Sequence, residues 1–119
     1  MTMFEKAFDK LVEHGLTVYP PATHKGDCLA PYVVIKDGVT TKVLGASSVR
    51  KLLTFIVYVP SKRYTDIEGI KQSVKSALDE LYPELLFTGN ETQPFLEDDN
   101  KSWNVSLEYR YICREGHIE

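Results

Sequence analysis

A short loop carries the residue types best suited to catalysis or metal binding. His24, Asp27 and Cys28 fall within the run His-Lys-Gly-Asp-Cys. These side chains bind metals, and a cysteine beside a histidine can act as a nucleophile. A zinc site needs further ligands, however, so a distant histidine, His14 or His117, would have to complete the set. We interpret the run as a polar loop and expect no metal and no cofactor.

A second group of reactive side chains is acidic. Glu97, Asp98 and Asp99 are consecutive in the sequence. Glycoside hydrolysis needs two carboxylates on opposite sides of one bond, whereas consecutive residues in a turn point in different directions. The chain also lacks a glycine-rich phosphate loop, and Ser47 and Ser48 do not follow a nucleophile-elbow pattern. The sequence therefore predicts a solvated acidic turn and a protein that is not an enzyme.

The longest regular pattern runs from Ser102 to Cys113. Its apolar set is Trp103, Val105, Leu107, Tyr109, Tyr111 and Cys113, and its polar set is Ser102, Asn104, Ser106, Glu108 and Arg110. Successive side chains of a strand point to opposite faces, so this alternation predicts a long strand with one buried face. The aromatic residues belong to that face, which favours core packing over a base-stacking platform. The polar face is either a solvent face or a wet surface between subunits, across which Glu108 and Arg110 pair.

Two helices are predicted. Spaced apolar residues indicate one from Thr2 to His14, which Gly15 ends. The second is expected from Thr65 to Tyr82, because Thr65-Asp66-Ile67-Glu68 matches a capping box and Pro83 stops the helix. Gly69 inside this helix indicates either close packing or a tolerated defect.

The remaining segments are predicted to be extended. Asp37-Gly38 lies between Tyr32–Ile35 and Val39–Leu44, which is a strong hairpin signal. The run Val49–Val59 is apolar on both faces, as in a central strand or one covered on its second side. Further extended pieces are expected at Leu16–Tyr19, Glu84–Thr88 and Thr92–Leu96.

The resulting order, α-β-β-β-α-β-β, favours an α+β fold. It would have a mainly antiparallel sheet of four to five strands, with two helices packed on one face. A length of 119 residues suits a single domain, residues 1–119.

Composition narrows the functional classes. The chain is 43% hydrophobic and 26% charged, which is typical of a globular protein. Its net charge is −3 and its basic residues are scattered, whereas nucleic-acid binders concentrate theirs on one surface. No apolar run is long enough to cross a membrane, and the first fifteen residues are charged throughout rather than forming a signal peptide. Two cysteines far apart in sequence suit a protein of the reducing cytoplasm.

Three segments resemble the tail-terminator, or tail-completion, proteins of tailed bacteriophages and prophage-like particles. They are the strand Val49–Pro60, the helix Thr65–Tyr82 and the closing segment Ser102–Arg114. Within the last, Val-Ser-Leu-Glu-Tyr-Arg-Tyr is similar to the family's closing strand, small-x-Leu-x-Tyr/Phe-x-Arg/Tyr. The resemblance covers most of the chain, but the Tyr32–Leu44 region has no fixed counterpart in the family.

The resemblance implies a structural role. Such proteins form a hexameric ring on the last ring of the tail tube, which ends tube polymerisation and joins the tail to the head and neck. The implied partners are further copies of the chain, the tail-tube protein and a head-completion or neck protein, with no membrane and no sequence-specific nucleic acid. The implied location is the host cytoplasm during assembly and then the virion tail or neck.

Under this interpretation, the polar residues between well-defined elements are candidates for a subunit or tube interface. These candidates are Thr40, Thr41, Lys42, Ser47, Ser48, Arg50, Lys51, Glu108 and Arg110. The loop Ala22–Pro31 is a further candidate, and deletion of Thr40–Ser48 is expected to spare the fold and abolish the ring.

Three alternatives remain open at the level of the sequence. The chain could be another head–tail connector component, such as an adaptor or stopper. It could be a small ligand-binding or enzyme domain with a site near His24, Asp27 and Cys28. It could also be a nucleic-acid module that uses its sheet, for which steeply salt-dependent DNA binding would be the signature.

Overall fold

A computed structural model describes residues 2–19, 28–42, 48–98 and 101–114. The molecule is elongated, with principal extents of 49 × 25 × 25 Å. Its elements in chain order are α1 (Met3–Glu13), β1 (Val18–Tyr19), β2 (Tyr32–Lys42), β3 (Ser48–Pro60), the 3-10 helix η1 (Ser61–Asp66), α2 (Ile67–Asp79), β4 (Leu86–Glu91), β5 (Phe95–Glu97) and β6 (Ser102–Arg114).

The fold is α+β, as predicted, and within the described ranges its sheet has six strands rather than four to five. The strand order is β1-β2-β3-β6-β4, and β5 also pairs with β6. Of these pairings, the short one between β1 and β2 is parallel and the others are antiparallel. The pairing of β3 with β6 is unbroken from Ser48↔Arg114 to Pro60↔Ser102, so these two long strands form the centre of the sheet. The apolar run Val49–Val59 was predicted to be either central or covered on its second side, and β3 is central.

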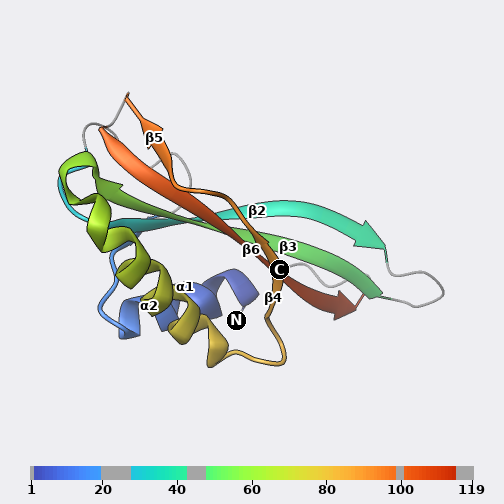
Figure 1. The fold of residues 1–119 in the computed structure, drawn as a ribbon. Coiled ribbons are helices and arrows are strands. Elements are labelled where there is room, and N and C mark those ends of the chain that lie inside the picture. The colour runs from blue at the N-terminus through green and yellow to red at the C-terminus, as the bar shows by residue number, and fades with distance from the viewer. Residues whose placement is uncertain (1, 20–27, 43–47, 99–100, 115–119) are drawn as a thin grey trace.

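The two helices lie together on one face of this sheet (Figure 1). Every second residue of a strand points to that face, so β2, β3 and β6 each contribute one buried side chain to a row. One row is Val33, Val57 and Val105, and the next is Ile35, Phe55 and Leu107. The helices contribute the remaining core residues, including Ala7, Leu11, Val74, Ala77 and Leu78. Beyond the helices, β2, β3 and β6 continue and project from the body of the molecule (Figure 1).

The hairpin predicted at Asp37-Gly38 is wrong, because β2 runs straight through it. The register with β3 shifts between Asp37 and Thr40, so the dipeptide belongs to a bulge that inserts one extra residue. A Cβ on Gly38 would lie 3.0 Å from the Leu52 Cβ and 3.2 Å from the Leu52 carbonyl oxygen. Close packing against β3 therefore favours glycine here, and the strand pairs with β3 up to Lys42 and Val49.

The capping box predicted at Thr65 is also wrong. Thr65 lies inside η1, α2 begins at Ile67, and its N-cap residue Asp66 makes no side-chain capping bond. Glu68 instead accepts a hydrogen bond from the Lys71 ammonium at 2.9 Å. Helix α2 ends at Asp79, short of the predicted Tyr82.

A capping box that the sequence reasoning missed begins α1. The Thr2 hydroxyl accepts from the Glu5 amide at 3.1 Å, and the Glu5 carboxylate accepts from the Thr2 amide at 3.4 Å. The predicted end of this helix is confirmed, since Gly15 has a φ of +81°, a conformation that favours glycine.

Ion pairs tie the helices to each other and to β4. The Lys10 ammonium and the His14 imidazole of α1 both contact the carboxylate of Glu80, just after α2. Lys71 and Lys75 of α2 contact the Glu91 carboxylate at the end of β4, at 3.0 and 2.9 Å. Hydrogen bonds from Lys75 and then Lys71 lower the pKa of Glu91, which favours its ionised form.

Candidate interaction surface

Among the residues that the structure describes, no helix covers the second face of the sheet (Figure 1). We call it the open sheet face. Its residues alternate along β2, β3 and β6 with those that enter the core: Val34, Lys36, Arg50, Leu52, Thr54, Ile56, Tyr58, Asn104, Ser106, Glu108 and Arg110. Most are only half-buried, and aliphatic side chains are interspersed with polar and charged ones. A mixed, partly exposed surface of this kind is typical of a wet protein–protein contact.

The end of this face beside β1 is filled by the chain's own aromatic rings. Tyr32 stacks on Tyr58 with ring centroids 4.7 Å apart, and Tyr19 meets Tyr32 edge-on at 5.3 Å. Tyr32 is buried as a result. The rest of the open sheet face, toward the projecting strands, is therefore the part that remains available to a partner.

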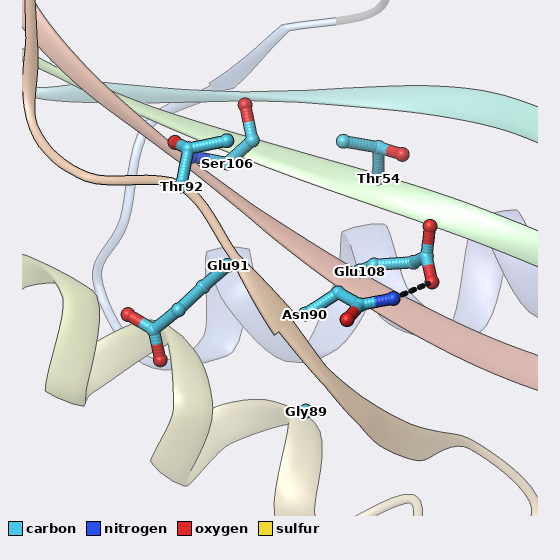
Figure 2. Close-up of a pocket in the computed structure, with 7 residues that line it drawn as sticks. All are labelled: Thr54, Gly89, Asn90, Glu91, Thr92, Ser106 and Glu108. Atoms are coloured by element: carbon cyan, nitrogen blue, oxygen red, sulfur yellow. Dashed lines mark hydrogen bonds between the residues drawn. The ribbon is translucent and has the colours of Figure 1, made fainter.

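A polar hollow of about 280 Å³ lies at the middle of the face, between β4 and β6 (Figure 2). Its lining residues are Thr54, Gly89, Asn90, Glu91, Thr92, Ser106 and Glu108. The Thr88 hydroxyl and the Asn90 side-chain amide both donate to Glu108 Oε1, each at 3.0 Å. Both donors belong to β4, so this strand fixes the position of the Glu108 carboxylate.

The hollow exists because β4 leaves its register with β6 between Phe87 and Glu91. Thr92 continues the hydrogen bonding to β6 just beyond this irregularity. The Thr92 hydroxyl accepts from the Ser106 amide at 2.9 Å, and the Thr92 amide donates to the Ser106 carbonyl at 3.0 Å. Gly89 has a φ of +92°, which lets the strand bend there. The sequence predicted extended pieces at Glu84–Thr88 and Thr92–Leu96, and this left out Gly89, Asn90 and Glu91 of β4, which line the hollow.

The structure brings most of the predicted interface residues together. The pairings Thr40↔Lys51, Thr41↔Arg50 and Lys42↔Val49 place the end of β2 beside the start of β3, where Ser48 also lies. Arg50, Glu108 and Arg110 line one hollow of about 410 Å³ with Leu52, Phe87 and Thr88. Ser47 lies outside the described residues. Segments from three parts of the chain thus converge on the projecting end of the sheet.

Several cations near the helices are ion-paired, and several on this part of the sheet are not. Lys6, Lys10, Lys71, Lys75 and Arg63 each contact a carboxylate. By contrast, Lys36, Arg50, Lys51 and Arg110 have no ion-pair partner within the part of the chain that the structure describes. Lys36, Arg50 and Arg110 belong to the open sheet face, whereas Lys51 pairs with Tyr111 and has the opposite strand parity. The open sheet face therefore presents three cations that are free to meet a partner.

The predicted reactive loop is described only at Cys28, since His24 and Asp27 lie outside the described residues. The Cys28 thiol is buried and donates to the Ala30 carbonyl at 3.4 Å. Burial raises its pKa, which disfavours the thiolate that a nucleophile or metal ligand needs. A hollow of about 430 Å³ borders it, lined by Cys28, Leu29, Pro60, Ser61, Lys62, Arg63 and Lys101.

The acidic residues predicted to form a turn begin at the end of strand β5. Glu97 ends β5, opposite Ser102, and Asp98 accepts a backbone hydrogen bond from Lys101 at 3.4 Å, while Asp99 lies outside the described residues. No group of three or more histidine, cysteine or acidic side chains that could hold a metal occurs among the residues described. Tyr109 and Tyr111 are buried in the core, as predicted.

No protein-family model matches this chain, and no curated protein matches it. Across the described ranges, no helix has both the length and the apolar character needed to cross a bilayer.

Proposed function

We propose that this protein is a structural, ring-forming component of a phage or prophage-like tail. Copies associate through the open sheet face and the projecting ends of β2, β3 and β6. The ring caps the tail tube, ends its polymerisation and offers a surface to the head or neck. Its place is the host cytoplasm during assembly and then the virion.

One observation carries the proposal: the sheet is far larger than the helix layer that covers it. Strands β3 and β6 are each 13 residues long, about twice the usual length, and they project past α1 and α2 on one side of the sheet (Figure 1). A sheet that only framed its own core would not need this extension. Presentation of surface to neighbouring subunits accounts for it.

The chemistry of the surface supports the same function. Leu52, Ile56 and Val34 provide apolar contact area, while Thr54, Ser106 and the cations around them provide polar contacts. The buried thiol of Cys28 and the already engaged carboxylate of Glu108 are poorly suited to nucleophilic or acid–base chemistry. These features favour an assembly surface over a reaction centre.

The test is light scattering on a size-exclusion column, with the protein alone and with purified tail-tube protein. Six copies of 13.5 kDa give an expected particle of about 81 kDa, alone or on the tube. A control variant, Lys62→Glu, changes an exposed charge away from the open sheet face and should assemble normally. A monomer that ignores the tube protein in every condition would exclude the proposed role.

A further inference from the structure

Two surfaces of the molecule carry opposite charge. On the open sheet face, Arg50, Arg110 and Lys36 form what we call the basic patch. The register places them on three successive rows of β3, because Arg110 lies opposite Leu52 and Lys36 opposite Thr54. Rows that face the same way are about 6.7 Å apart along a strand. None of the three cations has an ion-pair partner among the described residues.

On the opposite side of the molecule, α1 displays a line of carboxylates. Glu5, Asp9 and Glu13 recur every four residues, and all three are exposed. This acidic row has a spacing of about 6 Å, because an α-helix rises 1.5 Å per residue. Glu5 caps the helix, Glu13 contacts Lys10 at 3.5 Å, and Asp9 has no described partner. Val12 lies beside the row and is 49% exposed, so an apolar side chain accompanies the carboxylates.

We infer that the basic patch of one copy binds the acidic row on α1 of the next copy. The inference rests on the proposed ring function and specifies which surfaces join neighbouring subunits. The three cations lie on three neighbouring strands and step diagonally across the face, so they form a compact positive patch that is opposite in charge to the acidic row. Leu52, on the same rows as the cations, supplies an apolar contact for the exposed Val12.

The geometry favours a head-to-tail contact over a twofold one. The helix layer and the open sheet face lie on opposite sides of the sheet (Figure 1), so each copy presents both halves of the contact. Such a heterologous contact builds a ring when its rotation closes. A twofold contact through the open sheet face would instead oppose the basic patches of two copies, which like-charge repulsion disfavours.

A second copy also fits the patch better than nucleic acid does. Glu108 lies next to Arg110 along β6 and in the same row as Lys36, and the aliphatic Leu52 lies opposite Arg110. Nucleic-acid binders concentrate their cations on one surface, whereas these three are interspersed with a carboxylate and aliphatic side chains. The acidic row of another copy offers discrete carboxylates of opposite charge with the exposed Val12 beside them.

Charge-swapped variants test this contact. Variant A carries Arg50→Glu and Arg110→Glu, and variant B carries Asp9→Arg and Glu13→Arg; Glu5 is left intact because it caps α1. Sedimentation velocity at low salt should show that A alone and B alone associate at least about tenfold more weakly than the parent. An equimolar mixture should assemble again, because A and B alternate around an even-membered ring with opposite charges at every contact. Circular dichroism checks that both variants are folded.

Single substitutions and the salt dependence of association test the same contact further. Arg50→Glu should weaken association, whereas Lys62→Glu, the same kind of charge reversal near η1, should not. Association should also weaken from about 50 mM to about 500 mM salt, because partly exposed ion pairs are screened.

Each other outcome has a distinct meaning. If A and B assemble like the parent, this contact is wrong while the ring function stands. A parent that fails to associate, both alone and with the tube protein, overturns the contact and the proposed function together. Steeply salt-dependent binding of duplex DNA by the parent, lost in A, would assign the patch to nucleic acid and overturn the inference.

Discussion

The hydroxyl of Tyr109 offers the sharpest test of the packing. It is buried in the core and has no hydrogen-bond partner among the described residues. The ring itself is well packed, with Phe55 edge-on at 5.3 Å between centroids and Phe87 at 5.2 Å. An unsatisfied buried hydroxyl costs roughly 1–3 kcal/mol, so Tyr109→Phe removes that cost and keeps the aromatic contacts. We expect it to stabilise the protein by about 1 kcal/mol, which is about 4 °C in Tm for a chain of this size.

The assay is urea unfolding at pH 7, with thermal unfolding as a second measure. Tyr58→Phe is the matched control, because it makes the same change on the half-buried open sheet face and should shift stability by less than about 0.5 kcal/mol. Destabilisation of Tyr109→Phe by about 1 kcal/mol or more would show that the hydroxyl has a partner, and would refute the reasoning.

The pH dependence gives an independent readout of the same residue. Burial raises the pKa of Tyr109 above its ordinary value of about 10. The unfolded chain therefore loses this proton first, so stability is complete below about pH 10 and falls as the pH rises further. Tyr109→Phe should lose less stability than the parent in that alkaline range. An equal loss in both proteins would contradict the assignment.

Three further substitutions test local features, each by urea unfolding. Gly69→Ala should stabilise by up to about 1 kcal/mol, because a Cβ there meets nothing within 4 Å and alanine favours the helix; an unchanged midpoint would contradict this. Gly38→Ala should destabilise, by about 1–3 kcal/mol, because its Cβ would meet Leu52 at 3.0 Å, and a neutral result would show that β2 and β3 separate easily. Glu91→Gln should destabilise modestly at pH 7. Because the folded pKa of Glu91 is lowered, that difference should vanish as the pH falls below about 4.3, and a constant difference would exclude an ion-pair origin.

Sequence patterns predicted what depends on local periodicity. The alternation in Ser102–Cys113 gave β6 and its buried side chains Val105, Leu107, Tyr109 and Tyr111, because the strand period is a direct consequence of backbone geometry. The apolar run of β3 indicated a strand that is either central or covered on its second side, and the structure shows the first of these. The N-terminal helix was also predicted to within a residue at each end.

The errors arose where tertiary contacts override a local signal. Asp-Gly is a hairpin signal only if the chain turns there, and β2 instead uses Gly38 to approach Leu52 closely. Thr65 matched a capping pattern, but η1 precedes α2 and moves the helix start to Ile67. No local pattern reveals that β4 and β5 both line β6, since this depends on long-range pairing.

The candidate surface also combines residues that the sequence could predict with residues that only the fold brings together. Glu108 and Arg110 were selected from strand alternation, and the structure places them on the open sheet face. Their neighbours Thr88 and Asn90 could not be predicted, because they reach Glu108 only through the pairing of β4 with β6. The acidic row on α1 is visible in the sequence as a four-residue spacing, but its position opposite the open sheet face required the fold.

The central claim is that this protein ends the growth of a tail tube. The most direct measurement is the length of tubes polymerised from purified tube protein, seen by electron microscopy, with increasing amounts of this protein. The account predicts shorter tubes with a ring of this protein at one end, and no shortening by the charge-reversed Arg50→Glu, Arg110→Glu variant. Tubes of unchanged length, with no protein bound at their ends, would contradict it.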